Sequence, residues 1–163
     1  MSKIVDRIFE TVLTADDSVA KEELGSFRFG DGKIYKYVQF TDSITAAIGG
    51  PVLMNGTSSY QVTMDLDGGA GVGAVVGVAI ATNSPAYYGW IQTYGVATAK
   101  VTDVLTAGDH LVAATTDNFW SIGATDFTSA SAVAVTAHKS GAIALETTVT
   151  NTDATITAFV RCM

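Results

Sequence analysis

Short runs of alternating apolar and polar residues, separated by glycine-containing turns, extend through this 163-residue chain from residue 27 onward. A two-residue period sends alternate side chains to opposite faces of a strand. Turns roughly 8 to 12 residues apart are typical of sandwiches and barrels. The expected strands are 27–29, 33–40, 51–54, 60–64, 73–81, 87–94, 96–101, 111–114, 133–136, 142–148 and 155–161. No helical stripe follows residue 26, so the sequence predicts one all-β domain, a barrel or a sandwich, over residues 26–163.

The sequence around residue 30 is typical of a β-hairpin. Alternating residues flank Gly30-Asp31-Gly32, a three-residue turn whose glycines accept positive φ. The alternation then assigns the two faces of the second strand. One face is expected to carry Ile34, Lys36, Val38 and Phe40, and the other Tyr35, Tyr37 and Gln39.

The strongest strand pair is expected at 87–94 and 96–101, with Gly89 and Gly95 marking bulges or close approaches in a curved sheet. The first of these strands carries the aromatic residues Tyr87, Tyr88, Trp90 and Tyr94. Aromatic rings serve both packing and recognition. We interpret the set as core or subunit contacts, and a sugar-stacking platform is the alternative.

Residues 1–25 differ in kind from the rest and are expected to form an N-terminal arm or a short helix. Their apolar residues Val5, Ile8, Phe9 and Val12 are spaced i, i+3, i+4 and i+7, which makes one stripe on a helix. Such a segment either covers its own barrel or reaches a neighbouring subunit, and the sequence leaves both possibilities open.

Charge is distributed unevenly in this chain of net charge −7. Residues 1–36 hold six bases and seven acids, whereas residues 37–163 hold three bases and nine acids. The body has no basic stripe, so it lacks the counterion-release energy that drives nucleic-acid binding, and an anionic membrane surface repels it. We therefore expect no nucleic-acid and no membrane partner. A body with so little charge either has a surface made polar by Ser and Thr or is covered by other protein chains.

The sequence also indicates where the protein is made. The longest apolar run, Ala74–Ala81, is interrupted by Gly77 and is too short to cross a bilayer. Charged residues open the N-terminus, where a secretion signal would be apolar. Cys162 is the single cysteine, which excludes a disulfide within the chain. Synthesis in the cytoplasm is expected.

No motif for catalysis or for cofactor binding is complete. Gly68–Gly73 lacks the Gly-Lys-Ser/Thr ending of a phosphate loop, and Asp65–Gly68 begins like a calcium loop that has no closing glutamate. His110 and His138 are too few for a zinc site without coincidental further ligands. We expect no enzyme, no metal and no cofactor. The alternative, a small hydrolase using Asp109 and His110, has no nucleophile motif to support it.

The strand Tyr88-Gly89-Trp90-Ile91-Gln92, followed by Gly95-Val96-Ala97 and a return strand, resembles a strand of small structural proteins of tailed bacteriophages. These are the head decoration, or cement, proteins. The run Gly77-Val78-Ala79-Ile80, the hairpin at 24–38 and the turn Thr106–Asp109 fit the same pattern. The resemblance spans residues 24–115 and contains no catalytic signature.

The resemblance implies a compact β-barrel or β-tulip, arranged as trimers on the outer surface of the capsid. It implies a non-enzymatic virion protein whose partners are the major capsid protein and further copies of itself. This protein would clamp neighbouring capsid subunits of the expanded head, where many repeated contacts multiply modest affinities. The residues assigned to contacts with the capsid or a neighbouring subunit are Val5, Ile8, Phe9, Val12, Trp90 and Tyr94. The alternative function is a carbohydrate-binding module on a phage tail or fibre.

Overall fold

The computed structural model describes residues 9–41, 45–55, 60–65, 74–114, 118–123, 140–148 and 153–162. These residues form strands and irregular segments. The strands are β1 (Phe27–Gly30), β2 (Lys33–Phe40), β3 (Pro51–Met54), β4 (Gln61–Thr63), β5 (Val75–Ala79), β6 (Tyr88–Val101), β7 (His110–Ala113), β8 (Trp120–Ile122), β9 (Ser140–Ala144) and β10 (Ala154–Arg161). Within the described residues, no helix is long and apolar enough to cross a membrane.

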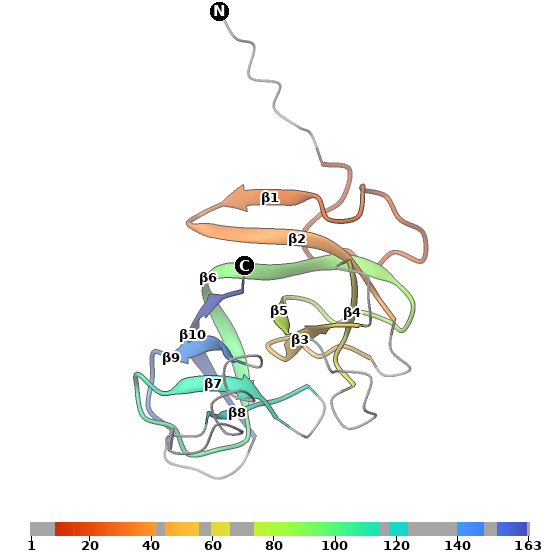
Figure 1. Ribbon diagram of the computed structural model, residues 1–163. Helices are drawn as coiled ribbons and strands as arrows, with labels where there is room; N and C mark the ends of the chain where they lie inside the picture. Colours follow the sequence, from red (N-terminus) through yellow and green to blue (C-terminus); the bar gives the residue numbers. More distant parts are fainter. Residues whose placement is uncertain are drawn as a thin grey trace, which may run out of the picture.

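A closed five-stranded barrel forms the first part of the fold. Strands β2, β4, β3, β5 and β6 pair in that order, and β6 pairs back onto β2. β1 lies at the other edge of β2, antiparallel to it (Figure 1). The structure confirms the expected all-β barrel.

β6 continues beyond the barrel into a second ring of strand pairing. Its second half pairs antiparallel with β10 from Tyr94 to Val101, and β10 leads on to β9, β7 and β8. A parallel bridge between Val101 and Trp120 closes this ring. In Figure 1, β6 runs along β2 and then turns towards β10. One strand therefore supplies a wall to both halves of the molecule.

The expected strand pair at 87–101 is wrong in one respect, because β6 is a single bent strand of 14 residues. The bend lies at Gly95, whose φ is +99°. The Gln92 side-chain amide donates to the carbonyl oxygens of Tyr94 and Val96, at 3.1 and 3.0 Å. These bonds satisfy backbone groups beside the bend, so the chain changes direction without leaving the sheet.

The expected hairpin is confirmed, with a tighter turn. Gly30 belongs to β1 and pairs with Lys33, which leaves Asp31 and Gly32 as a two-residue turn with φ values of 51° and 73°. Positive φ at both positions is the mark of a type I′ turn, whose twist matches that of the strands. The faces of β2 are also as expected. Val38 and Phe40 point into the barrel.

Three apolar clusters hold the fold together. The first fills the barrel between β2, β3, β4 and β6 and includes Phe40 and Met64. The second fills the other ring around Trp120 and Leu111, and Leu53 and Val75 of the barrel strands join it. The third lies on the outer wall of the barrel around Tyr37 and Trp90. The two rings therefore share packing as well as β6.

Two further expectations differ from the structure near the C-terminus. β9 ends at Ala144, before the expected end at 148. At the expected end, Thr148 is bonded to the loop before β7, where its hydroxyl accepts a hydrogen bond from the N–H of Leu105 at 2.9 Å. β8 was not expected, since it has only three residues. The expected strand at 133–136 lies outside the described residues.

Gly95→Ala tests the bend in β6. A Cβ atom there would lie 2.7 Å from the carbonyl oxygen of Gly32, at a φ that L-residues rarely adopt. Gly108 has the same φ of +99°, and a Cβ atom at that position would meet no atom within 4 Å beyond its own residue and the two chain neighbours, so Gly108→Ala isolates the conformational cost. We expect Gly108→Ala to lower the free energy of unfolding by about 1–2 kcal/mol. Gly95→Ala should cost at least about 1 kcal/mol more. Equal losses in urea unfolding would show that the approach to Gly32 does not constrain the bend.

Candidate functional site

The chain before β1 lies over the outer wall of the barrel. Trp90 of β6 is fully buried beneath it. The Phe9 ring meets the Trp90 ring edge to face at 5.2 Å, and the Tyr37 ring contacts the Trp90 ring at the same separation. Leu13 and Leu24 pack against the same cluster. The described part of the N-terminal segment, residues 9–26, is irregular and not helical.

Hydrogen bonds hold this segment in place. The Trp90 indole N–H donates to the Thr11 hydroxyl at 2.8 Å. That hydroxyl in turn donates to the Glu22 carboxylate at 3.2 Å. The same carboxylate oxygen accepts the backbone N–H groups of Glu10 and Thr11 at 2.7 and 3.1 Å. The buried Trp90 N–H is therefore paired with the Thr11 hydroxyl. Glu22, further along the segment, holds that threonine in place.

A second set of bonds anchors the middle of the segment. The Asp16 carboxylate accepts from the N–H and the hydroxyl of Ser84, at 2.9 and 2.7 Å. The side chain of Asn83 donates to the carbonyl oxygen of Ala15 at 3.1 Å. The backbone of Asp17 forms an isolated antiparallel β-bridge with that of Tyr88 in β6. The described segment thus docks on its own barrel.

The candidate contact residues therefore have different surroundings. Phe9 and Trp90 point into the outer-wall cluster, whereas Val12 is 67% exposed. Tyr94 lies on the second half of β6, where its ring packs edge to face on Phe159 at 5.2 Å. Val5 and Ile8 lie outside the described residues. Of the described members, Trp90 has no surface available to a neighbour, whereas Val12 is exposed and Phe9 and Tyr94 are partly exposed.

An apolar face that the sequence analysis did not single out lies on the second ring. Phe159 of β10 pairs with Val96 on one side and with Ile143 on the other. Val96 and Ile143 are 45% and 37% exposed, and Leu145 beside them is 46% exposed. The alternation of apolar residues in β10 is visible in the sequence. The face can be recognised only when the register of β10 with β6 and β9 is known.

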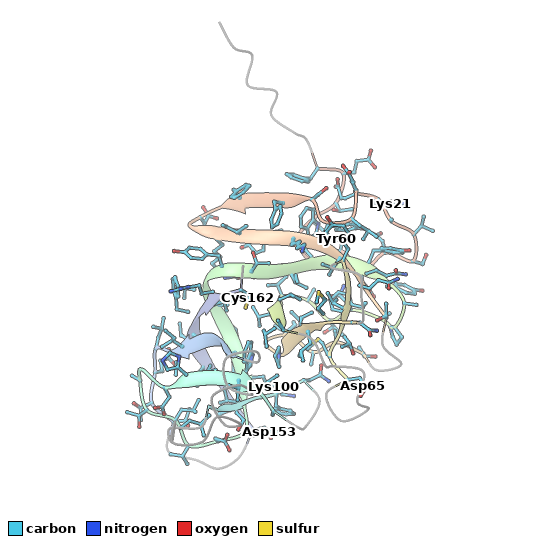
Figure 2. All side chains as sticks on the ribbon, in the orientation of Figure 1. Lys21, Tyr60, Asp65, Lys100, Asp153 and Cys162 are labelled. Carbon is cyan, nitrogen blue, oxygen red and sulfur yellow. The ribbon has the colours of Figure 1, made fainter. Side chains whose placement is uncertain are left out.

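A pocket of about 500 Å³ opens at one end of the barrel, and we call it the barrel mouth. Its lining is almost entirely apolar: Phe27, Phe29, Ile34, Lys36, Ala74, Val75, Val76, Thr93 and Cys162. The Lys36 ammonium lies 5.8 and 5.0 Å from the ring centroids of Phe27 and Tyr60. Burial lowers the pKa of this lysine. Figure 2 shows Tyr60 close to β2 and Cys162 below the β1–β2 hairpin.

Cys162 is a buried thiol at the floor of the mouth. Its Sγ donates to the carbonyl oxygen of Gly141 at 3.3 Å, and 7% of the residue is exposed. Burial raises the pKa of the thiol to about 12. A nucleophilic cysteine needs the opposite shift, so this one acts as a small apolar side chain.

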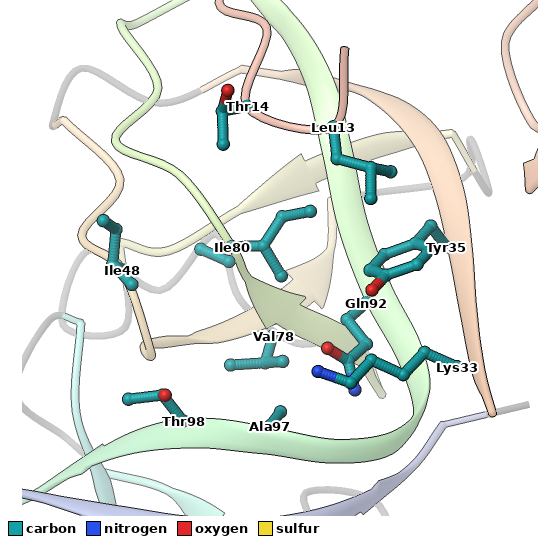
Figure 3. A pocket seen from close by; sticks show the side chains of 11 residues that line it. Leu13, Thr14, Lys33, Tyr35, Ile48, Val78, Ile80, Gln92, Ala97 and Thr98 are labelled. Carbon is teal, nitrogen blue, oxygen red and sulfur yellow. The ribbon is translucent and has the colours of Figure 1, made fainter. Parts of the chain in front are cut away.

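A smaller cleft of about 270 Å³ lies between the N-terminal segment and the strands β5 and β6 (Figure 3). Lys33 reaches across it towards Gln92, with the Tyr35 hydroxyl on the same side. Burial, with a further contribution from the charge of Asp31, raises the pKa of Tyr35. Among the described residues, no carboxylate, histidine or cysteine lines this cleft. The polar side chains that it offers are those of Lys33, Tyr35, Gln92, Thr14 and Thr98.

Asp109 and His110, which the alternative hydrolase function would use, lie where the turn before β7 ends and the strand begins. The Asp109 carboxylate accepts the backbone N–H of Thr106 at 2.7 Å, which closes the loop before β7. His110 is exposed and opposes Ile143 of β9. In the described part of the chain, no three His, Cys, Asp or Glu side chains gather where they could hold a metal ion. The glycine-rich stretch at 68–73 and His138 lie outside it.

Thr11→Val tests the link between Trp90 and the N-terminal segment. Valine keeps the shape but leaves a buried indole N–H unpaired and removes a donor from Glu22. We expect the free energy of unfolding to fall by about 1–3 kcal/mol. Thr14→Val, at an exposed position of the same segment, is the control and should stay within about 0.5 kcal/mol of wild type. Equal effects in urea unfolding would count against the link.

The buried thiol predicts a pH dependence of stability. Because its pKa rises from 9.0 in the unfolded chain to about 12 in the fold, only the unfolded state ionises between these values. The stability that it contributes is complete below pH 9 and is lost as the pH rises towards 12. Between about pH 8 and about pH 11, thermal unfolding should show a steeper loss for wild type than for Cys162→Ala. Parallel profiles would exclude the thiol as the source.

Comparison with known proteins supports the fold. No family model matches this sequence, and no curated protein sequence matches it. Among solved structures, the fold is similar to that of the N base of head fiber gp8.5 in bacteriophage phi29, with a TM-score of 0.51 and 10% sequence identity. The match covers 78% of this chain and 93% of that chain. At this identity, the two proteins share an all-β fold.

Proposed function

We propose that this chain is a structural protein of a tailed-phage virion that binds the outer surface of the head and clamps neighbouring capsid subunits. The observation that carries the proposal is the fold shared with the base of a phage head fiber over most of both chains. The strand and hairpin pattern of residues 24–115 supports it independently, because that pattern resembles head decoration proteins. The proposed partners are the major capsid protein and further copies of the chain as a trimer.

The surface of the protein suits adhesion to other proteins. Two exposed valines, Val12 and Val19, project from the N-terminal segment, which is fixed to the barrel through Trp90 and Asp16. A rigidly held apolar surface loses little conformational entropy on binding. The apolar face around Phe159 provides a second such area.

The surroundings of the second-ring face suit a protein partner better than nucleic acid. Lys100 and Arg161 lie on strands of this face, and they are two of the three bases after residue 36 in a chain of net charge −7. Two cations beside exposed apolar side chains suit a protein surface with scattered acids. Nucleic-acid binding relies on a longer row of cations.

A second candidate is the base of a fibre attached to the head, and it is favoured by the identity of the similar structure, a head-fiber base. A sugar-stacking platform on the aromatic residues of β6 has less support. Trp90 has no exposed surface, and the Tyr88 ring stacks on that of Tyr37 at 6.5 Å. An enzymatic role has no complete catalytic motif in the sequence to support it.

The number of copies per virion separates the two candidates. Quantitative mass spectrometry of purified virions, referenced to the major capsid protein, should find this chain near stoichiometric with the shell if it clamps capsid subunits. A small fixed number per virion would favour the fibre base instead. Complete absence from virions would contradict both.

The amount of protein bound to reconstituted heads, measured in the same way, tests whether Val12 contacts the capsid. Heads that lack the protein are incubated with wild type, with Val12→Asp and with Val104→Asp. Val104 is a control because it is 47% exposed and lies in the connection between β6 and β7, outside the N-terminal segment. Burying an unpaired carboxylate in a contact is costly, so Val12→Asp should bind at least about tenfold more weakly. Equal binding by all three proteins would remove Val12 from the contact.

A further inference from the structure

β1 has one paired and one open edge. Among the described strands it pairs with β2 alone and lies at the end of the sheet order. The Tyr37 N–H donates to the carbonyl oxygen of Ser26 at 2.9 Å. Hydrogen-bonded pairs alternate along an antiparallel ladder, so Arg28 and Gly30 also direct their backbone groups towards β2. The N–H and C=O groups of Phe27 and Phe29 therefore point away from the sheet.

The side chains at this edge are apolar and exposed. Phe27 and Phe29 are 49% and 72% exposed, and their rings lie 6.5 Å apart. Both line the barrel mouth together with Ile34 and Val75. Exposed apolar edge strands attract further strands, and proteins commonly protect them with charge, proline or a covering segment. Here the outward backbone groups lie directly beside an apolar pocket.

Charge at this edge has the opposite sign to the whole chain. The β1–β2 hairpin carries Arg28, Lys33 and Lys36 against Asp31, in a protein of net charge −7. The two faces differ. Lys36 lies beside Phe27 at the mouth, whereas the Arg28 guanidinium points to the other face, 5.4 Å from the Phe9 ring centroid. A strand added here would meet apolar surface on one face and a cation on the other.

We propose that the open edge of β1 binds an extended segment of a partner protein as an added antiparallel strand, with an acidic residue between two apolar ones. The two apolar residues would oppose Phe27 and Phe29, exchange backbone hydrogen bonds with them and place their side chains over the barrel mouth. The acidic residue would oppose Arg28 on the other face. Backbone pairing gives affinity in this mode and the alternating side chains give specificity. This inference does not depend on the proposed virion function.

A defined peptide tests the proposal. The probe is acetyl-Ser-Thr-Val-Glu-Ile-Thr-Ser-amide, titrated into the ¹⁵N-labelled full chain. The backbone amides of Phe27 and Phe29 should shift and become protected from hydrogen exchange. The same peptide N-methylated at valine and isoleucine keeps its side chains but cannot pair, and it should bind at least about tenfold more weakly. The peptide with lysine in place of glutamate should also bind more weakly.

Two substitutions at one position separate the backbone from the ring. Phe29→Pro removes an outward N–H that β2 does not use, and proline is tolerated at sheet edges. Phe29→Val keeps the N–H and replaces the aromatic ring with a smaller apolar side chain. Phe29→Pro should abolish the binding that Phe29→Val only weakens. The amide spectra and unfolding midpoints of both variants show whether the barrel is intact.

Three outcomes would overturn the proposal. The first is no shift at Phe27 and Phe29 up to about 1 mM peptide with a folded protein. The second is equal binding of the N-methylated peptide, which would indicate occupation of the apolar mouth without strand pairing. The third is a shift of the same amides with protein concentration alone, which would assign the edge to a second copy of the chain.

Discussion

The bend of β6 at Gly95 is the constraint on which the rest of the structure depends. One half of β6 closes the barrel against β2, and the other half pairs with β10 and opens the second ring. The left-handed backbone at Gly95 and its close approach to Gly32 bring the β1–β2 turn against the middle of this strand. The Gln92 amide donates to the carbonyl groups of the two residues that flank the bend. Moving this bend would shift both rings relative to each other.

The N-terminal segment depends on the same strand. Trp90 lies on the barrel half of β6 and presents its indole to the outside of the barrel, where water would otherwise reach it. Phe9 covers the ring and Thr11 satisfies the N–H. The segment therefore completes the outer wall, and its remaining apolar residues, Val12 and Val19, are left at the surface. Covering the barrel and presenting an adhesive surface are compatible because different residues of the segment face opposite ways.

Local signals in the sequence predicted the local structure well. The alternation of residues 33–40 predicted the two faces of β2, and Gly30-Asp31-Gly32 predicted the hairpin, whose turn is one residue shorter than expected. The bent strand was expected as two strands, because a glycine looks the same in sequence whether it ends a strand or bends one. β8 was not expected because three residues carry no period. For the contact residues, the helical spacing of Phe9 and Val12 placed them on one face, whereas the irregular chain turns Phe9 inward and Val12 outward.

The sequence by itself determined the class of the fold, the hairpin, and the absence of a complete catalytic motif, because these depend on residues close together in the chain. The tertiary structure decided the closure of the barrel, the burial of Trp90, and the juxtaposition of the β1 edge with a pocket formed by β5 and Cys162. Each of these joins segments far apart in sequence, and their register is fixed by packing and backbone pairing that no single segment encodes.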